Sequence, residues 1–164
     1  TSIEGEFENL IDLQEDQLAC VTVAGRAIRN RPGILSELSM ALAEAGINID
    51  AVSSGMDSIT FYVASEVAEE SEALLHEEII DSETLSWITV DDPVAVIRIT
   101  GGDLQDEPGI VNDIGAPLAA EHINVQDVIT AATSVAVFVD WSEREEVLSI
   151  VQEQVSIAHD SVSR

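Results

Sequence analysis

The sequence predicts an α+β fold built from two copies of one unit, each an antiparallel sheet with helices on one face. The first observation is a repeat at a constant offset of 76 residues, from Gly33 to Gly109. The second is the pattern inside each copy, where apolar residues at helical spacing follow a Pro-Gly pair and apolar strand-like runs lie on either side. Together they give the order strand–helix–strand–strand–helix–strand in each copy.

The repeat is informative because one offset holds along the chain without a gap. The matched residues are Gly25 with Gly101, Pro32 with Pro108, Gly33 with Gly109, Ile34 with Ile110, Leu42 with Leu118, Ile47 with Ile123, Asn48 with Asn124 and Val52 with Val128. Chance rarely preserves a single spacing over so many positions, so the chain consists of two copies of one unit.

The first copy starts with the apolar segment QLACVTVAG at 17–25, which ends at glycine and predicts a strand. A helix is expected from Pro32 to Gly46, because proline is tolerated in a first turn and glycine is favoured after a last one. The remaining expected elements are strands at 47–54 and 58–65, an acidic amphipathic helix at 66–80 and a strand at 85–92.

The second copy has the same elements, except that its last strand is missing. The expected elements are a strand at 93–101, a helix from Pro108, strands at 123–130 and 134–141 and a helix at 142–155. The tail SIAHDSVSR is a poor strand candidate, whereas residues 7–13 resemble the segment before the second copy. We therefore expect residues 7–13 to supply the missing strand. The predicted units are 17–91, which is inserted, and 1–16 plus 92–164.

The charge balance excludes one large class of partners. The chain has 32 acidic and 6 basic residues, a net charge of −26, and every basic residue is arginine. Nucleic-acid binding needs clustered lysine and arginine, so it is excluded, as is RNA recognition, which would also need sheet aromatics. We interpret the charge as adaptation to a salty cytoplasm, typical of a halophile, because concentrated salt screens self-repulsion. The alternative is an acidic surface made for a cationic partner.

The remaining composition predicts no membrane segment, metal site or catalytic centre. No stretch approaches the 18 apolar residues of a membrane span, so a cytoplasmic location is expected. The single cysteine, Cys20, lies in an apolar strand and is expected to be buried. The three histidines lack the spacing of a metal site. We expect Met40, Met56, Trp87 and Trp141 to fill the core.

The paired segments VTVAGRAIRNRPGILSELSMALAEAGINIDAVSS and IRITGGDLQDEPGIVNDIGAPLAAEHINVQDVIT resemble the ACT domain, a small-molecule sensing module with a ferredoxin-like βαββαβ fold. The resemblance covers almost the whole chain. More specifically, the two segments resemble the paired ACT domains at the C-terminal end of aspartate kinase. The chain departs from that pattern before each Pro-Gly pair and after each second strand, in SSGMDS and TAATS, so the resemblance does not identify the effector side chain.

This resemblance implies an amino-acid-binding regulatory module, feedback-controlled by lysine or threonine, that forms a homodimer through its ACT units. It acts on a kinase domain in cis or, alternatively, as a free-standing sensor on a separate enzyme in trans. The family's kinase motif is absent, and a chain without lysine cannot supply the phosphate-clamping lysine. We therefore expect no catalysis by this chain alone and no cofactor, only an effector amino acid. A free enzyme of another kind is the remaining alternative.

The start of each predicted helix is the candidate ligand site. A first turn carries unpaired amides and a partial positive charge, and glycine allows a carboxylate to approach. An α-amino acid would place its carboxylate at Gly33 to Leu35, and Asp50 is the candidate partner for a cationic group. The candidate residues are Asn30, Gly33, Ile34, Leu35, Asn48, Asp50 and Ser54 in the first copy, and Asp106, Gly109, Ile110, Val111, Asn124, Val125 and Thr130 in the second.

Each of these residues also has a purely structural interpretation. Pro-Gly is often only a helix-start signal. Asn48 and Asn124 are alternatively fasteners of the turn after the helix, through side-chain bonds to the backbone. Asp50 is alternatively one more solvated carboxylate.

Overall fold

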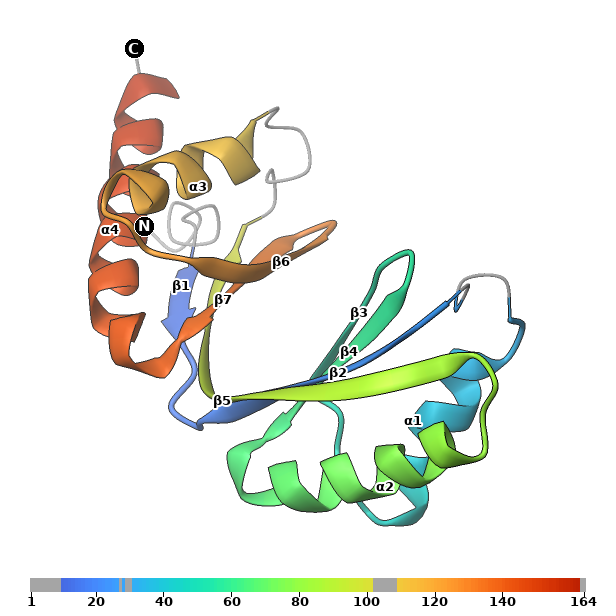
Figure 1. Ribbon diagram of the computed structural model, residues 1–164. Helices are drawn as coiled ribbons and strands as arrows, with labels where there is room; N and C mark the ends of the chain where they lie inside the picture. The colour runs from blue at the N-terminus through green and yellow to red at the C-terminus, as the bar shows by residue number, and fades with distance from the viewer. Residues whose placement is uncertain (1–9, 27, 29–30, 102–108, 163–164) are drawn as a thin grey trace. The chain divides into compact units, whose positions relative to one another are not determined.

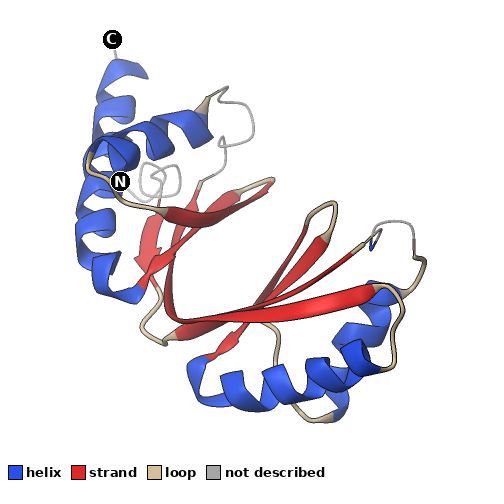
Figure 2. Ribbon diagram, viewed as in Figure 1, coloured by secondary structure: helices blue, strands red, loops and turns tan. Residues whose placement is uncertain are grey.

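The computed structural model describes residues 10–26, 28, 31–101 and 109–162 (Figure 1). Contacts divide the chain into two compact units, residues 16–94 and residues 1–15 plus 95–164. We call these the first and the second unit. Each is an antiparallel sheet with two helices on one face (Figure 2), so the predicted fold class is confirmed.

The first unit has the strand order β3–β4–β2–β5. Its elements are β2 (Leu18–Gly25), α1 (Ile34–Glu44), β3 (Ala51–Ser54), β4 (Ser58–Ala64), a 3-10 turn (Ser65–Val67), α2 (Ala68–Ile80) and the first part of β5 (Leu85–Thr100). β2 is central because it is apolar along its length and almost wholly buried. β3, which follows α1 in the chain, lies at the edge of the sheet.

The second unit repeats this arrangement around the later part of β5. Its elements are β1 (Leu10–Leu13), α3 (Ile110–Ala120), β6 (Val125–Ala131), β7 (Ser134–Asp140), a 3-10 turn (Trp141–Glu143) and α4 (Arg144–Val162). β7 lies between β5 and the edge strand β6. β1 pairs antiparallel with β5, with Leu10 opposite Thr100 and Leu13 opposite Ile97.

Three predicted features differ from the structure. The strand expected at 47–54 is shorter and forms β3 (Ala51–Ser54). The segments 85–92 and 93–101, expected as separate strands, form the single strand β5. The last helix, expected to end at 155, continues to Val162 as α4. The tail is a continuation of this helix because Ser156–Val162 contains no glycine or proline that would stop it.

Each unit has its own apolar core, and the repeat places equivalent residues in both. Leu38 and Leu42 of α1 are fully buried. Leu118 of α3, the counterpart of Leu42, is also fully buried. Strand positions alternate, so that Val21 and Val23 of β2 face the helices. Apolar burial at these helical and strand periods therefore explains why each helix docks on its sheet.

Three residues that we expected in the core are exposed. Met40 is 57% exposed because it lies between the inward positions Leu38 and Leu42 and faces away from the sheet. Trp87 is 58% exposed, since its neighbour Ile88 packs on the core and successive strand residues face opposite ways. Met56, at 69%, lies in the turn after β3. Of the four, Trp141 alone packs against a core, that of the second unit.

Acidic side chains cover the outer face of α2. On α2, Glu69, Glu70, Glu72 and Glu77 are exposed. Six arginines cannot neutralise 32 carboxylates, so most of this charge must be balanced by ions in solution. No helix in the described part of the chain is long and apolar enough to cross a membrane. Among the same residues, no group of three His, Cys, Asp or Glu is placed to hold a metal ion.

The charge predicts that salt stabilises the fold. Raising KCl from 0.1 M to 1 M shortens the screening length from about 10 Å to about 3 Å, which weakens repulsion among the carboxylates. We expect the midpoint of unfolding in urea, an uncharged denaturant, to rise steadily over this range. The matched control replaces KCl with sucrose at equal osmolality, which should give a smaller rise. A midpoint that is unchanged or lower in KCl would contradict the prediction.

Because the two cores are built alike, we predict that truncating equivalent leucines lowers the free energy of unfolding by similar amounts. We expect Leu42→Ala and Leu118→Ala each to lower the free energy of unfolding by about 2–5 kcal/mol, because each leaves a cavity in a closed core. Met40→Ala, in the same helix as Leu42, should change it by less than about 0.5 kcal/mol. Urea unfolding followed by circular dichroism at fixed KCl measures all three. Similar losses for Leu42→Ala and Met40→Ala would show that burial does not decide the effect.

Candidate functional site

Both predicted helix starts have the same backbone geometry. Gly33 precedes α1 with φ 82° and ψ −2°, and Gly109 precedes α3 with φ 89° and ψ 7°. This left-handed conformation favours glycine. No side chain caps either helix through a hydrogen bond, and the first helical bonds run from the amides of Glu37 and Asp113 to the carbonyls of the two glycines, at 2.9 Å each. The earlier first-turn amides therefore have no partner within their helix.

A cavity of about 550 Å³ lies at the start of α1. It is lined by Arg31, Gly33, Ile34, Leu35 and Ser36 around the helix start and by Ser54 at the end of β3, among others. Small-molecule sites commonly have volumes of about 300–1,000 Å³. The lining combines apolar side chains, two serine hydroxyls, the positive end of a helix and one guanidinium. Such a surface suits a small molecule that carries a carboxylate.

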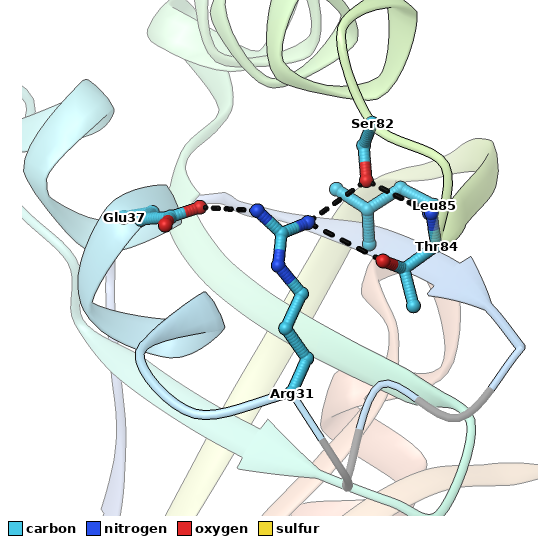
Figure 3. A network of polar contacts seen from close by, with 5 residues as sticks. All are labelled: Arg31, Glu37, Ser82, Thr84 and Leu85. Carbon is cyan, nitrogen blue, oxygen red and sulfur yellow. Dashed lines mark hydrogen bonds and ion pairs between the residues drawn. The ribbon is translucent and has the colours of Figure 1, made fainter.

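Arg31 joins the start of α1 to the turn between α2 and β5 (Figure 3). Its Nη1 donates to Ser82 Oγ at 2.9 Å and to Thr84 Oγ1 at 3.4 Å, while its Nη2 forms an ion pair with Glu37 Oε2 at 3.1 Å. Ser82 Oγ in turn accepts from the backbone amides of Thr84 and Leu85. The Arg31 side chain is about one-third exposed. It is thus held in place at the cavity and still open to solvent.

The structure gathers part of the predicted first-copy site. Gly33, Ile34, Leu35 and Ser54 all line the cavity. The other predicted residues are not among those described at its wall: Asn48 and Asp50 are exposed, and Asn48 Nδ2 donates to Asp50 Oδ1 at 3.0 Å. The backbone amide of Asp50 donates to the Tyr62 carbonyl. Asn30 lies outside the described residues.

The predicted second-copy residues fall into three groups. Gly109 and Ile110 form the start of α3. Val111 and Val125 border an apolar cavity beside β6. Asn124 and Thr130 are exposed, before β6 and near its end. Asp106 lies outside the described residues.

Sequence reasoning did not select Arg31, Ser36 or Gly55, which also line the first cavity. Arg31 had a usable signal, because it is one of only six basic residues and directly precedes the Pro-Gly pair. Ser36 and Gly55 had none, since serine and glycine at such places are common in any helix or turn.

One carboxylate outside the cavity has a clear structural role. Hydrogen bonds from the side chain and the backbone amide of Ser142 hold the pKa of Asp140 below its usual value. Asp140 accepts both bonds, at 2.6 Å from Oγ and 2.9 Å from the amide, and so caps the turn that leads into α4. The Arg144 guanidinium, 4.2 Å from the Trp141 ring centre, packs over the same turn. This cluster is a helix cap.

Comparison with known proteins agrees with the repeat. The ACT domain family matches residues 21–79 and, separately, residues 89–153. The aspartokinase of Mycolicibacterium smegmatis is 34% identical over 152 residues, which are 87% of this chain and 35% of that protein. The chain spans about a third of the length of the curated relatives it matches.

Solved structures show the same fold. The regulatory subunit of aspartate kinase from Thermus flavus superposes with a TM-score of 0.77 at 20% identity, over 88% of this chain and 95% of that one. The aspartate kinase from Synechocystis gives a TM-score of 0.77 at 26% identity, over 90% of this chain and 26% of that one. With two family matches that together cover most of its length and follow its internal repeat, the chain belongs to the ACT-domain family and carries two ACT domains.

Proposed function

We propose that this chain is the regulatory part of an aspartate kinase and that it binds an amino-acid effector, threonine or lysine, in feedback control of aspartate-family biosynthesis. The cavity at the start of α1 is the observation that carries the binding proposal. The similarity to aspartokinases supports the choice of enzyme. The chain itself is proposed to be non-catalytic, because it has no lysine to hold a phosphate.

In the proposed complex the effector carboxylate lies against the first-turn amides after Gly33, where the helix dipole favours negative charge. The Arg31 guanidinium reinforces this end of the cavity, because charge-assisted hydrogen bonds to a carboxylate are among the stronger ones. The effector ammonium would then lie against backbone carbonyls at the end of β3, which is an edge strand among the described residues.

The cavity favours threonine over lysine as the effector of the first unit. The hydroxyls of Ser36 and Ser54 match a small polar side chain. A lysine side chain would need a nearby carboxylate, and among the described lining residues none is acidic. Asp50, the sequence-based candidate for that role, is instead bonded to Asn48.

Effector binding regulates only if it changes the balance between two states of the assembly. We propose a homodimer formed through the ACT units, in which β3 and β6 are edge strands of the sheet that the described residues form. The coupling between effector and enzyme would amount to about 1–3 kcal/mol, as in other allosteric proteins. Light scattering in high salt tests the dimer.

The kinase partner is in cis or, as a second candidate, a separate chain regulated in trans. The second arrangement is supported by the Thermus flavus regulatory subunit, of which this chain covers 95%. Co-purification of the tagged chain with a separately expressed kinase chain would support it. The proposed setting in either case is a salt-rich cytoplasm, in keeping with a net charge of −26.

Two left-handed glycines provide a matched test of the binding site. Gly33 has φ 82° and Gly46, at the far end of α1, has φ 76°, and an added Cβ would meet nothing within 4 Å at either. Gly33→Ala and Gly46→Ala should therefore carry a similar backbone cost of about 1–2 kcal/mol. We expect only Gly33→Ala to lose threonine binding, measured by calorimetry in molar KCl. No heat from the wild-type protein with either threonine or lysine would refute the proposed function.

Arg31 provides a test of how the carboxylate is held. Arg31→Gln should weaken threonine binding by about 10- to 100-fold, because a hydrogen bond to a charged group contributes about 1.5–3 kcal/mol. Arg98→Gln in β5 makes the same change in net charge outside this cavity and should leave the affinity unaltered. Equal effects of the two substitutions would mean that Arg31 acts only through overall charge.

A further inference from the structure

The second unit contains an apolar cavity of about 200 Å³ beside its edge strand β6. It is formed by residues of α3, β6 and β7, including Val111, Ile114, Gly115, Val125, Val128 and Val137. Every side chain of the described lining is aliphatic, or absent at glycine. Val111, one of its lining residues, is 44% exposed although it is a large apolar residue.

The repeat shows which residues create this space. In the first unit Val52 of β3 pairs with Phe61 of β4, and in the second unit Val128 pairs with Val137 in the same register. Phe61 is fully buried in the first core. The second unit therefore has an isopropyl group where the first has a phenyl ring.

Gly115 widens the cavity from the helix side. Its counterpart in the first unit is Ser39, and a Cβ added at Gly115 would meet nothing within 4 Å. Glycine is among the least favourable residues within a helix, so its presence in α3 carries a cost to stability. Because Gly115 has no side chain, the cavity is wider at this point of its wall. The helix itself does not require a glycine here.

A space of this kind suits an apolar group of limited size. Apolar cavities do not hold ordered water, and a cavity of about 150 Å³ accepts benzene. In an unfilled cavity, the atoms of the lining also lack van der Waals contacts on the side that faces the empty space. The occupant that fits is thus one branched aliphatic side chain or a single ring, which contrasts with the serine- and arginine-lined cavity of the first unit.

We propose that the second unit binds an amino acid with a branched aliphatic side chain, such as leucine, and that this side chain occupies the cavity between α3 and β6. The proposal rests on the amino-acid-sensing function proposed for the ACT units. It assigns the two units different effectors, a small polar one in the first and an apolar one in the second.

The test is calorimetry on the full chain in molar KCl with L-leucine, and with glycine as the matched zwitterion without a side chain. We expect leucine to bind and glycine to give no heat. Val137→Phe introduces the residue of the first unit and should weaken leucine binding at least 10-fold. Because the larger ring could prevent folding, Gly115→Ser is a second, smaller obstruction, and Ser39→Ala at the equivalent position of α1 is its control.

Circular dichroism establishes that each variant is folded. Leucine binding that is weakened by Gly115→Ser and unchanged by Ser39→Ala would support the proposal. It would be overturned if leucine, isoleucine and valine all give no heat with the wild-type protein, or if both folded cavity variants bind leucine normally. A silent wild-type protein whose self-association is weakened by Val137→Phe would identify a second copy as the occupant, which also overturns it. Threonine and lysine titrated in the same samples test the proposed function separately.

Discussion

The architecture depends on a backbone constraint at the start of two helices. Gly33 and Gly109 turn the chain through the left-handed region directly before α1 and α3. This turn lets each helix begin without a capping side chain and lie over its sheet, with Leu42 or Leu118 in the core. The same feature that starts the helix leaves its first amides without a partner inside the helix. In the binding mode proposed for the first unit, folding and ligand recognition share this one structural element.

The sequence was sufficient for features that depend on local periodicity. The fold class followed from apolar spacing, which is carried by residues close together in the chain, and from a repeat that can be read by sliding the sequence along itself at one offset. Long-range features were not accessible. The bonds from Arg31 to Ser82 and Thr84 join residues about 50 positions apart, and nothing in either segment indicates the other. The exposure of Trp87 depends on which face of β5 meets the helices, which a mixed apolar segment does not specify.

Comparison of the two units separates what the fold requires from what has diverged. Backbone features are retained, including the glycine conformation, the 11-residue lengths of α1 and α3, and the pairing of Val52 with Phe61 and Val128 with Val137. The cavities differ in place as well as in lining, because Leu35 and its counterpart Val111 are the one repeat-related pair among the described lining residues. Serines and an arginine line the cavity of the first unit, and only aliphatic residues and glycine line that of the second. Among the candidate site residues, the helix-start glycines were thus the most predictable. The cavities were the least predictable, because they arise from differences in side-chain volume across a packed sheet.

The central claim is that open amides at the start of α1 receive the carboxylate of a small amino acid. Amide chemical shifts recorded by NMR during a threonine titration in molar KCl test it most directly. The account predicts that the signals of Ile34, Leu35 and Ser36 shift saturably and by more than those elsewhere in the first unit. Saturable binding that leaves these three amides unperturbed would contradict it.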